Sequence, residues 1–247
     1  MLEFRAAPGR LTDRLRRRDP AATCPAGLCV LVTEACSDIG RATATRLAGR
    51  GMRLVLVDRH ADRLAEVRER ITASGGLARE RRCDLSALGD IDQLVEWVRG
   101  EFGAVDVLVN NADATLRAVA PSPDRFRDYQ RSMAANYFGP LRLTLGLVPA
   151  LRLARSGLVV NVGPRPLAET CFAGATAAWS TFGHCADAEL AQQGIRVCAV
   201  DTAPASNERA TIAAHGVETA IRERHRPSAS RRSRAPRGPG GISPHGG

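Results

Sequence analysis

The sequence predicts an α/β fold in which a parallel sheet is covered by helices on both faces. Short apolar runs alternate with longer amphipathic stretches from Leu28 onward, which is the order of repeated βα units. Several of the runs are apolar at consecutive positions, as at residues 54–57, and strands buried on both faces have this composition. A chain of 247 residues with 44% apolar content suffices for one such domain with tails.

Six strands and five helices follow one another in alternation. The strands are short apolar runs at residues 28–33, 53–58, 77–83, 105–110, 157–162 and 195–201. Apolar residues at helical spacing predict helices over 39–51, 61–74, 91–102, 124–154 and 176–193. In the third of these helices, Ile91, Leu94 and Val98 fall on one stripe that can face a sheet.

The two ends of the chain differ in composition from this central part. We expect an Arg-rich arm at 1–26, the folded domain at 27–205, and a segment at 206–225 that permits one more helix. Residues 226–247 are rich in Arg, Pro and Gly and are predicted to be disordered, because they cannot bury enough apolar surface. After Asp201 the sequence has no apolar run that can supply a regular seventh strand.

The net charge of +9 belongs to the ends, and every basic residue is arginine, since the chain has no lysine. Residues 1–20 carry six Arg against three acids and residues 222–247 seven against one, so the part between them is neutral. The tail lacks the interleaved aromatic residues that stack on bases. We therefore expect a solvated tail, with contact to nucleic acid or anionic lipid as the less favoured alternative.

The cysteine and hydropathy patterns argue against several classes of protein. The seven cysteines form no C-x-x-C pair and show no ligand-like spacing with the histidines, which argues against a metal site or a disulfide framework. No apolar run reaches the roughly 18–20 residues of a membrane span, and the N-terminus lacks the apolar core of a secretory signal. A cytoplasmic protein without a membrane span is predicted.

One glycine-poor turn carries a family resemblance. Thr33-Glu34-Ala35-Cys36-Ser37-Asp38-Ile39-Gly40 resembles the Thr-Gly-x-x-x-Gly-x-Gly cofactor turn of the short-chain dehydrogenases/reductases. Further landmarks of that family follow in order over residues 27–201, namely Asp58, Asp84-Leu85, Asn110-Asn111-Ala112, Asn136, Val159–Val162, and Phe182, Glu189, Leu190 and Gly194. The resemblance implies a Rossmann-like, doubly wound parallel sheet in the strand order 3-2-1-4-5-6. Residues 124–133 resemble its acyl-CoA reductase, fatty-aldehyde-forming branch.

The resemblance also implies a nicotinamide dinucleotide, NAD or NADP, as the cofactor. Its expected binding residues are Thr33, Ser37, Ile39, Gly40, Asp58, Arg59, Asp84, Leu85, Asn110 and Ala112. Asp58 fits the ribose hydroxyls of NAD and Arg59 the extra phosphate of NADP, so the choice between them is open. Glu34 and Asp38 replace the first two glycines of the turn, and their carboxylates are expected to weaken binding by repelling the pyrophosphate. Asp38 is also a candidate N-cap that takes the place of a phosphate at the helix start.

The catalytic positions of the family are altered. Phe172 and Thr176 stand where the resemblance places a Tyr-x-x-x-Lys pair, and Gly163 or Pro164 stands in place of its serine. A shifted alignment cannot restore the pair, because the chain has no lysine and its two tyrosines lie at positions 129 and 137. Asn136 is the family's one catalytic position that is kept.

Neither of two nearby side chains is an evident replacement for the missing pair. His184 lies about 18 Å from Phe172 along a helix at about 1.5 Å per residue. Cys171 has no neighbouring base in the sequence that would favour its thiolate.

Two functions therefore remain. The first is an impaired or inactive member of the family that keeps the scaffold. The alternative is a working NAD(P)-dependent carbonyl or acyl reductase with an unrecognised proton donor. In either case the resemblance implies a homodimer or homotetramer formed through the long helices at 124–154 and 176–193.

Overall fold

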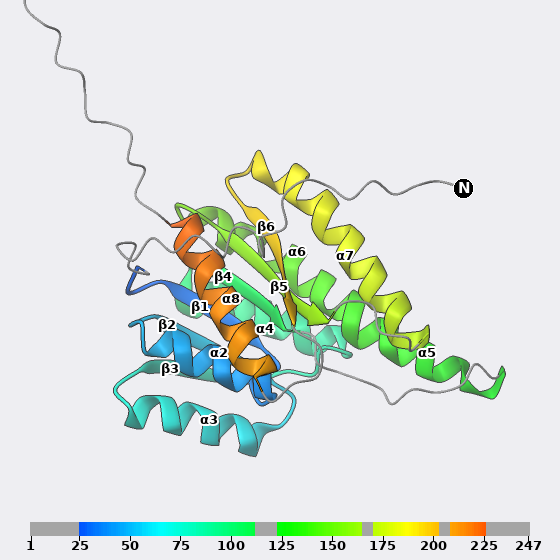
Figure 1. The fold of residues 1–247 in the computed structure, drawn as a ribbon, viewed down its shortest axis with the longest axis horizontal. Helices are drawn as coiled ribbons and strands as arrows, with labels where there is room; N and C mark the ends of the chain where they lie inside the picture. Colours follow the sequence, from blue (N-terminus) through cyan, green and yellow to red (C-terminus); the bar gives the residue numbers. More distant parts are fainter. Residues whose placement is uncertain (1–24, 112–122, 165–169, 203–207, 226–247) are drawn as a thin grey trace, which may run out of the picture.

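The computed structural model describes residues 25–111, 123–164, 170–202 and 208–225, which form a parallel six-stranded sheet between two layers of helices (Figure 1). The strands are β1 (Cys29–Thr33), β2 (Arg53–Asp58), β3 (Leu77–Arg82), β4 (Val107–Asn111), β5 (Leu158–Pro164) and β6 (Arg196–Thr202). They lie in the order β3-β2-β1-β4-β5-β6, and all pairs are parallel. The predicted fold class and strand order are confirmed.

Both faces of the sheet are covered. Helices α2 (Asp38–Ala48), α3 (Ala61–Ala73) and α8 (Arg209–Arg224) pack on one face, and α4 (Leu88–Phe102), α6 (Gly139–Leu153) and α7 (Thr170–Ala191) on the other. Along β1, Val30 and Val32 join the first core and Cys29 and Leu31 the second. Because successive strand residues point to opposite faces, burial on both sides explains the uninterrupted apolar runs.

The expected single helix over 124–154 is wrong. The segment consists of a 3-10 turn η1 (Pro123–Arg125), α5 (Phe126–Met133), a π turn η2 (Ala134–Phe138) and then α6. The amide of Gly139 bonds to the carbonyl of Ala134, five residues back, and the following Pro140 has no amide to continue an α-helical pattern. A Cβ at Gly139 would lie 2.0 Å from the carbonyl oxygen of Leu85, so the chain passes that loop closely here.

Helix α7 starts earlier than its apolar spacing predicts, at Thr170 rather than at residue 176. Phe172 and Thr176 therefore both lie inside one helix, one turn apart. Helix α8, which falls within 206–225, is held to α2 through Glu218, whose side chain is 4% exposed and pairs with Arg46 and, at 2.8 Å, with Arg50. A buried carboxylate with two arginine partners fixes the position of α8 against α2.

Several expectations fall on other parts of the chain. The arm up to residue 24, the tail at 226–247 and Ala112 lie outside the described residues. Within the described part, β6 is an edge strand and the sheet has no seventh strand. No helix in that part combines the length and apolar character that crossing a membrane requires.

Candidate functional site

The carboxyl ends of β1, β2 and β3 surround a cavity of about 270 Å³. Of the predicted cofactor residues, Ser37, Asp58, Arg59, Asp84 and Leu85 line it, joined by Ala135 from the π turn. In open α/β sheets a ligand binds outside the carboxyl ends of the strands, close to where the strand order reverses. This cavity is therefore the candidate ligand site.

The turn from β1 to α2 is closed by its own side chains. Ser37 has the extended backbone of an N-cap, and its hydroxyl accepts the amide of Gly40 at 3.0 Å and the side-chain amide of Asn111 at 2.9 Å. Glu34 has a φ of 47°, in the left-handed region that favours glycine. A Cβ at Gly40 would lie 2.2 Å from the carbonyl oxygen of Glu34, so only glycine fits at position 40.

The expectation that Asp38 is the N-cap is wrong. Asp38 is the first residue of the helix itself, one position after the cap, and its side chain is 82% exposed and paired with Arg41. Glu34, by contrast, lies among the residues that line the cavity. Of the two substituted glycine positions, Glu34 is the one that belongs to the cavity lining.

Asp58 is buried, with 6% of its surface exposed, and it ties two loops together. One carboxylate oxygen accepts the amide of Cys36 at 3.0 Å, and the other accepts the amide of His60 at 3.0 Å and faces the His60 ring Nδ1 at 2.9 Å. Burial opposes its ionisation, but the bonds from His60 and Cys36 outweigh it and lower the pKa of Asp58 below its ordinary 3.8. With the side chains of both His60 and Cys36 also bonded to it, all of the carboxylate's about four lone-pair sites are used.

Asp84 and the cationic residues form the outer part of the cavity. One oxygen of Asp84 accepts the amide and the hydroxyl of Ser86 at 2.9 and 2.7 Å. Burial acts against the charged form, yet these two bonds prevail and lower the pKa of Asp84. Arg63 on α3 donates to the carbonyl of Cys36 at 3.2 Å, which places its guanidinium beside the β1–α2 turn, and Arg59 is exposed at the rim.

Sequence reasoning missed part of this lining. His60, Arg63, Cys36, Ser86 and Ala135 all contribute to the cavity. The position of Arg63, three residues into α3, gives a weak signal, since a long side chain in a first helical turn can reach back to the preceding loop. The contribution of Ala135 follows only from the π turn and had no signal in the sequence.

Other predicted cofactor residues hold the scaffold together. The hydroxyl of Thr33 donates to the carbonyl of Val109 at 3.3 Å and accepts the amide of Asn111 at 2.9 Å, joining β1 to β4. The side chain of Asn110 donates to Thr144 at 3.1 Å and to Asn161 at 3.2 Å. The cavity lining includes none of the predicted residues Thr33, Asn110, Ile39 and Gly40.

The positions that the resemblance assigns to catalysis do not line the cavity. Phe172 is 0% exposed, and the hydroxyl of Thr176 donates to the carbonyls of Phe172 and Ala173 at 3.0 and 3.2 Å, back onto its own helix. Asn136, 1% exposed in the π turn, donates to the carbonyl of Ser132 at 3.1 Å. None of them lines the cavity. Pro164 ends β5, and its side chain lies outside the described residues.

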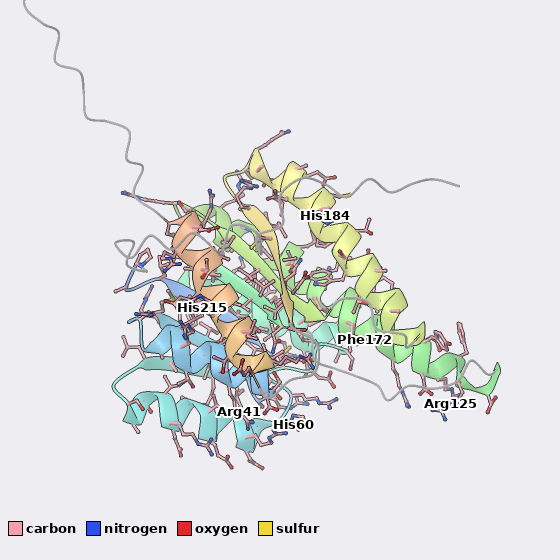
Figure 2. The ribbon with its side chains drawn as sticks, in the orientation of Figure 1. Arg41, His60, Arg125, Phe172, His184 and His215 are labelled. Carbon is pink, nitrogen blue, oxygen red and sulfur yellow. The ribbon has the colours of Figure 1, made fainter. Side chains whose placement is uncertain are left out.

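His184 and Cys171 were the two residues considered as replacements for the missing catalytic pair. Figure 2 shows His184 farther along α7 than Phe172, and His184 is exposed. The side chain of Cys171 lies outside the described residues. Burial raises the pKa of the thiols of Cys36 and Cys83 to about 12, so neither is an ionised nucleophile at neutral pH. Over the described residues, no group of His, Cys, Asp and Glu can hold a metal.

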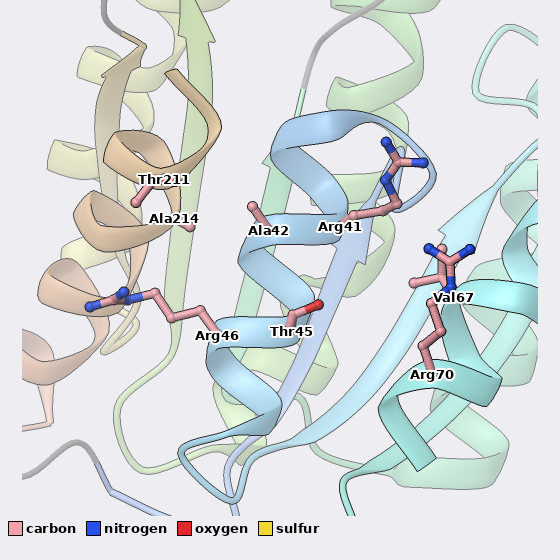
Figure 3. A pocket seen from close by; sticks show the side chains of 8 residues that line it. All are labelled: Arg41, Ala42, Thr45, Arg46, Val67, Arg70, Thr211 and Ala214. Carbon is pink, nitrogen blue, oxygen red and sulfur yellow. The ribbon is translucent and has the colours of Figure 1, made fainter. Parts of the chain in front are cut away.

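A second cavity, of about 430 Å³, lies between α2, α3 and α8 (Figure 3). In Figure 3, Arg46 extends from α2 towards α8, and Arg41 and Arg70 lie on the side of α3. Each has an acidic partner, Asp38 for Arg41, Glu218 for Arg46, and Glu66 at 3.7 Å for Arg70. The positive charge of this groove is therefore compensated within the protein, and the groove is not a strong anion site.

Comparisons with known proteins agree with the fold. The family model for short chain dehydrogenases matches residues 28–215. The chain is 34% identical over 180 residues to a fatty acyl-CoA reductase of Acinetobacter baylyi, covering 70% of this chain and 61% of that protein. It thus spans less than two thirds of the length of this relative.

Solved structures give the same result. A metagenomic short-chain oxidoreductase in complex with NADP superimposes with a TM-score of 0.69 at 28% identity, covering 80% of this chain and 91% of the other. An NAD+-bound xylitol dehydrogenase does so with a TM-score of 0.66 at 28% identity, covering 72% and 70%. The chain belongs to the short-chain dehydrogenase/reductase family of NAD(P)-dependent oxidoreductases, in a branch that resembles the acyl-CoA reductases.

Proposed function

We propose that this chain is a short-chain dehydrogenase/reductase that has lost the family's catalysis and keeps the nucleotide-binding part of the scaffold. The observation that carries the proposal is the state of the two catalytic positions. Phe172 has a ring but no proton to exchange and is fully buried, and Thr176 turns its hydroxyl to its own helix. Neither side chain reaches the cavity at the ends of β1–β3.

The physical reason is proton chemistry. An unperturbed phenol has a pKa of about 10, and a neighbouring cation is what makes a tyrosine useful near neutral pH. Loss of a positioned general acid costs about 10²–10⁴ in rate, and residues that act as a unit do not lose activity additively. The raised pKa values of the Cys36 and Cys83 thiols, and the exposed place of His184 outside the cavity lining, argue against these three residues as substitutes.

The family cofactor, NAD or NADP, fits this chain only in part. Solved relatives hold NADP or NAD+, and the cavity offers Asp58, Asp84 and Leu85 to an adenosine half. A bound nicotinamide supplies or accepts a hydride, and Phe172 and Thr176 have nothing with which to move the accompanying proton. Weakened cofactor binding is proposed as well, because Glu34 belongs to the lining and its negative charge opposes that of a pyrophosphate.

A turnover assay tests the proposal. The full chain is incubated with NADH or NADPH and either a long-chain aldehyde or a fatty acyl-CoA, the substrate class named for the Acinetobacter relative. We expect no nucleotide oxidation above the protein-free control. Turnover of about 1 s⁻¹ or more, within the ordinary range for enzymes, would refute the loss of catalysis.

The double variant Phe172→Tyr with Thr176→Lys tests whether the pair alone is missing. We expect it to stay inactive, since position 172 is fully buried and Glu34 remains in the cavity. The single variant Thr176→Lys is the matched control for the added charge. Recovery of aldehyde reduction in the double variant would show that the cofactor turn was never the obstacle.

A working carbonyl or acyl reductase is the second candidate. It is favoured by the fatty acyl-CoA reductase relatives and by Asn136, which stays at a π turn of the kind often found at functional sites. The predicted homodimer or homotetramer through the helices at 124–154 and 176–193, and the cytoplasmic location, remain predictions. Size-exclusion chromatography with light scattering tests the assembly.

A further inference from the structure

We propose that the contact between α8 and α2 is a pH-sensitive device, in which protonation of His215 loosens the attachment of α8. Four side chains form the contact, Arg46 and Arg50 from α2 and the turn after it, and His215 and Glu218 from α8. None of them lines the cavity at the ends of β1, β2 and β3. The device is therefore independent of the proposed function.

The hydrogen bond between Arg46 and His215 requires a neutral imidazole. Arg46 extends towards α8 (Figure 3), and one NH2 group of its guanidinium lies 3.0 Å from the Nδ1 of His215. Arginine has only donors, so Nδ1 is the acceptor and the neutral ring carries its proton on Nε2. A protonated imidazole has an N–H group at both nitrogens. Protonation of His215 therefore removes this hydrogen bond.

The charges of the contact act in the same direction. One carboxylate oxygen of Glu218 is paired with the Nε of Arg46, and the other is paired with the Nε of Arg50 at 2.8 Å. Two positive charges thus face one negative charge, and a protonated His215 adds a third positive charge beside Arg46. Because the ring of His215 is exposed, water and salt screen part of the repulsion, and loss of the hydrogen bond is the larger effect.

The charged groups of α8 itself do not titrate in the range that matters. Glu218 lies one turn from His215, and Glu208 and Arg222 lie two turns away on either side, with opposite charges. Carboxyl groups ordinarily titrate near pH 4 and arginine above about pH 12. These neighbours therefore keep their charge between about pH 5.5 and pH 7.5.

The elements that pack against α8 do not add a group that titrates there either. Arg41 and Arg70 line the groove beside the contact, and both are paired with carboxylates. In the core beneath α8, burial raises the pKa of the Cys198 thiol to about 12, and its neighbours from β5 and β6 are Val160, Val162 and Val200. Histidine is the residue type that ordinarily changes charge near pH 6.5, so the state of the contact depends on His215.

The apolar face of α8 limits the response to loosening. Ala213, Val217, Ala220 and Ile221 are buried in the core on this side of the sheet. Burial of these side chains does not depend on pH, so it keeps α8 in place when His215 is protonated. We therefore expect α8 to open more often at low pH while the domain as a whole stays folded.

Hydrogen–deuterium exchange of the full chain at about pH 7.5 and pH 5.5 tests the inference, with the rates corrected for the intrinsic effect of pH on exchange. We expect the protection of α8 amides to fall by about three- to tenfold at the lower pH. Protection of α3, which covers the same face of the sheet, is expected to change by less than about twofold. Equal protection of α8 at the two pH values would overturn the inference.

Two variants assign the response to His215. In His215→Gln the side-chain carbonyl can accept from Arg46 at either pH, so we expect α8 protection to become independent of pH. His184→Gln, the same change at an exposed position of α7, is the matched control and should keep the response of the unmodified chain. Circular dichroism confirms folding at both pH values. An unchanged response in folded His215→Gln, or its loss in His184→Gln, would refute the role of His215.

Discussion

Replacing Glu34 by glycine changes the backbone energy of the β1–α2 turn and the charge of the cavity at once. At a φ of 47°, a residue with a β-carbon is disfavoured by about 1–2 kcal/mol. Glycine adopts this φ without that penalty but loses about 0.5–1 kcal/mol through its greater freedom in the unfolded chain. We expect a net stabilisation of about 0.5–1 kcal/mol, which raises the melting midpoint by about 1–4 °C for a chain of this size.

The same substitution removes a negative charge from the ligand site. Two like charges about 4 Å apart repel by about 4 kcal/mol at an effective dielectric near 20, and longer distance and salt reduce this to about 1–2 kcal/mol. Glu34→Gly is therefore expected to tighten NADH binding by about tenfold. The gain should shrink in about 1 M salt, where the screening length is about 3 Å.

Glu34→Gln separates the two effects. Glutamine keeps the β-carbon at the same φ but has no charge, so it should match the glycine variant in affinity without matching its higher melting midpoint. Calorimetric melting and titration with NADH measure the two quantities on the same preparations. The reasoning is refuted if glutamine leaves the affinity unchanged, or if glycine fails to melt higher than glutamine.

The remaining predictions concern stability and accessibility. Glu218→Gln should lower the free energy of unfolding by about 1–3 kcal/mol, because it weakens the ion pairs between α8 and α2. Its control, Glu223→Gln at an exposed position of α8, should change that free energy by no more than about 0.5 kcal/mol. Urea unfolding compares the two variants, and equal costs would contradict the role of Glu218 in holding α8 to α2. The side-chain hydrogen bond from Arg196 holds the pKa of Asp187 below its ordinary 3.8. The stabilising effect of this ion pair should therefore be complete well above pH 4 and should fall as the pH drops through 3.8 towards the lower folded pKa. In Asp187→Asn this part of the pH dependence of stability should vanish, and an unchanged profile would exclude a contribution from Asp187. Iodoacetamide at neutral pH should label the exposed Cys185 before the buried Cys83, because burial raises the pKa of the Cys83 thiol to about 12. Mass spectrometry measures the two labelling rates, and faster labelling of Cys83 would contradict the structure.

The fold could be predicted because its signals are local and repeated. Uninterrupted apolar strands such as residues 54–57 and single-stripe helices such as α4 depend on burial between the layers, which β1, β2 and β4 share and the exposed edge strand β3 does not. The π turn could not be predicted in the same way. It depends on the close approach of Gly139 to the carbonyl of Leu85, two segments that are far apart in the sequence.

The sequence predicts which residues lie at the site, but it does not predict the hydrogen bonds that they make. The resemblance assigns Asp58 and Asp84 to cofactor binding, and in the structure both residues line the same cavity. Their capacity for a ligand depends on the partners Cys36, His60 and Ser86, which only the folded chain brings together. The capping role moved from Asp38 to Ser37 because a shift of one residue in the start of a helix lies within the uncertainty of sequence patterns.

The closed hydrogen bonding of the β1–α2 turn has a consequence for the stability of the fold. Ser37 caps α2, and Asp58 receives the amide of Cys36, so the turn is satisfied by groups of the chain itself. A ligand then adds stability only in proportion to the logarithm of its concentration over its dissociation constant. The fold of the turn therefore does not depend on a nucleotide, and a nucleotide at a hundredfold excess over its dissociation constant would add about 2.7 kcal/mol to a turn that is already formed.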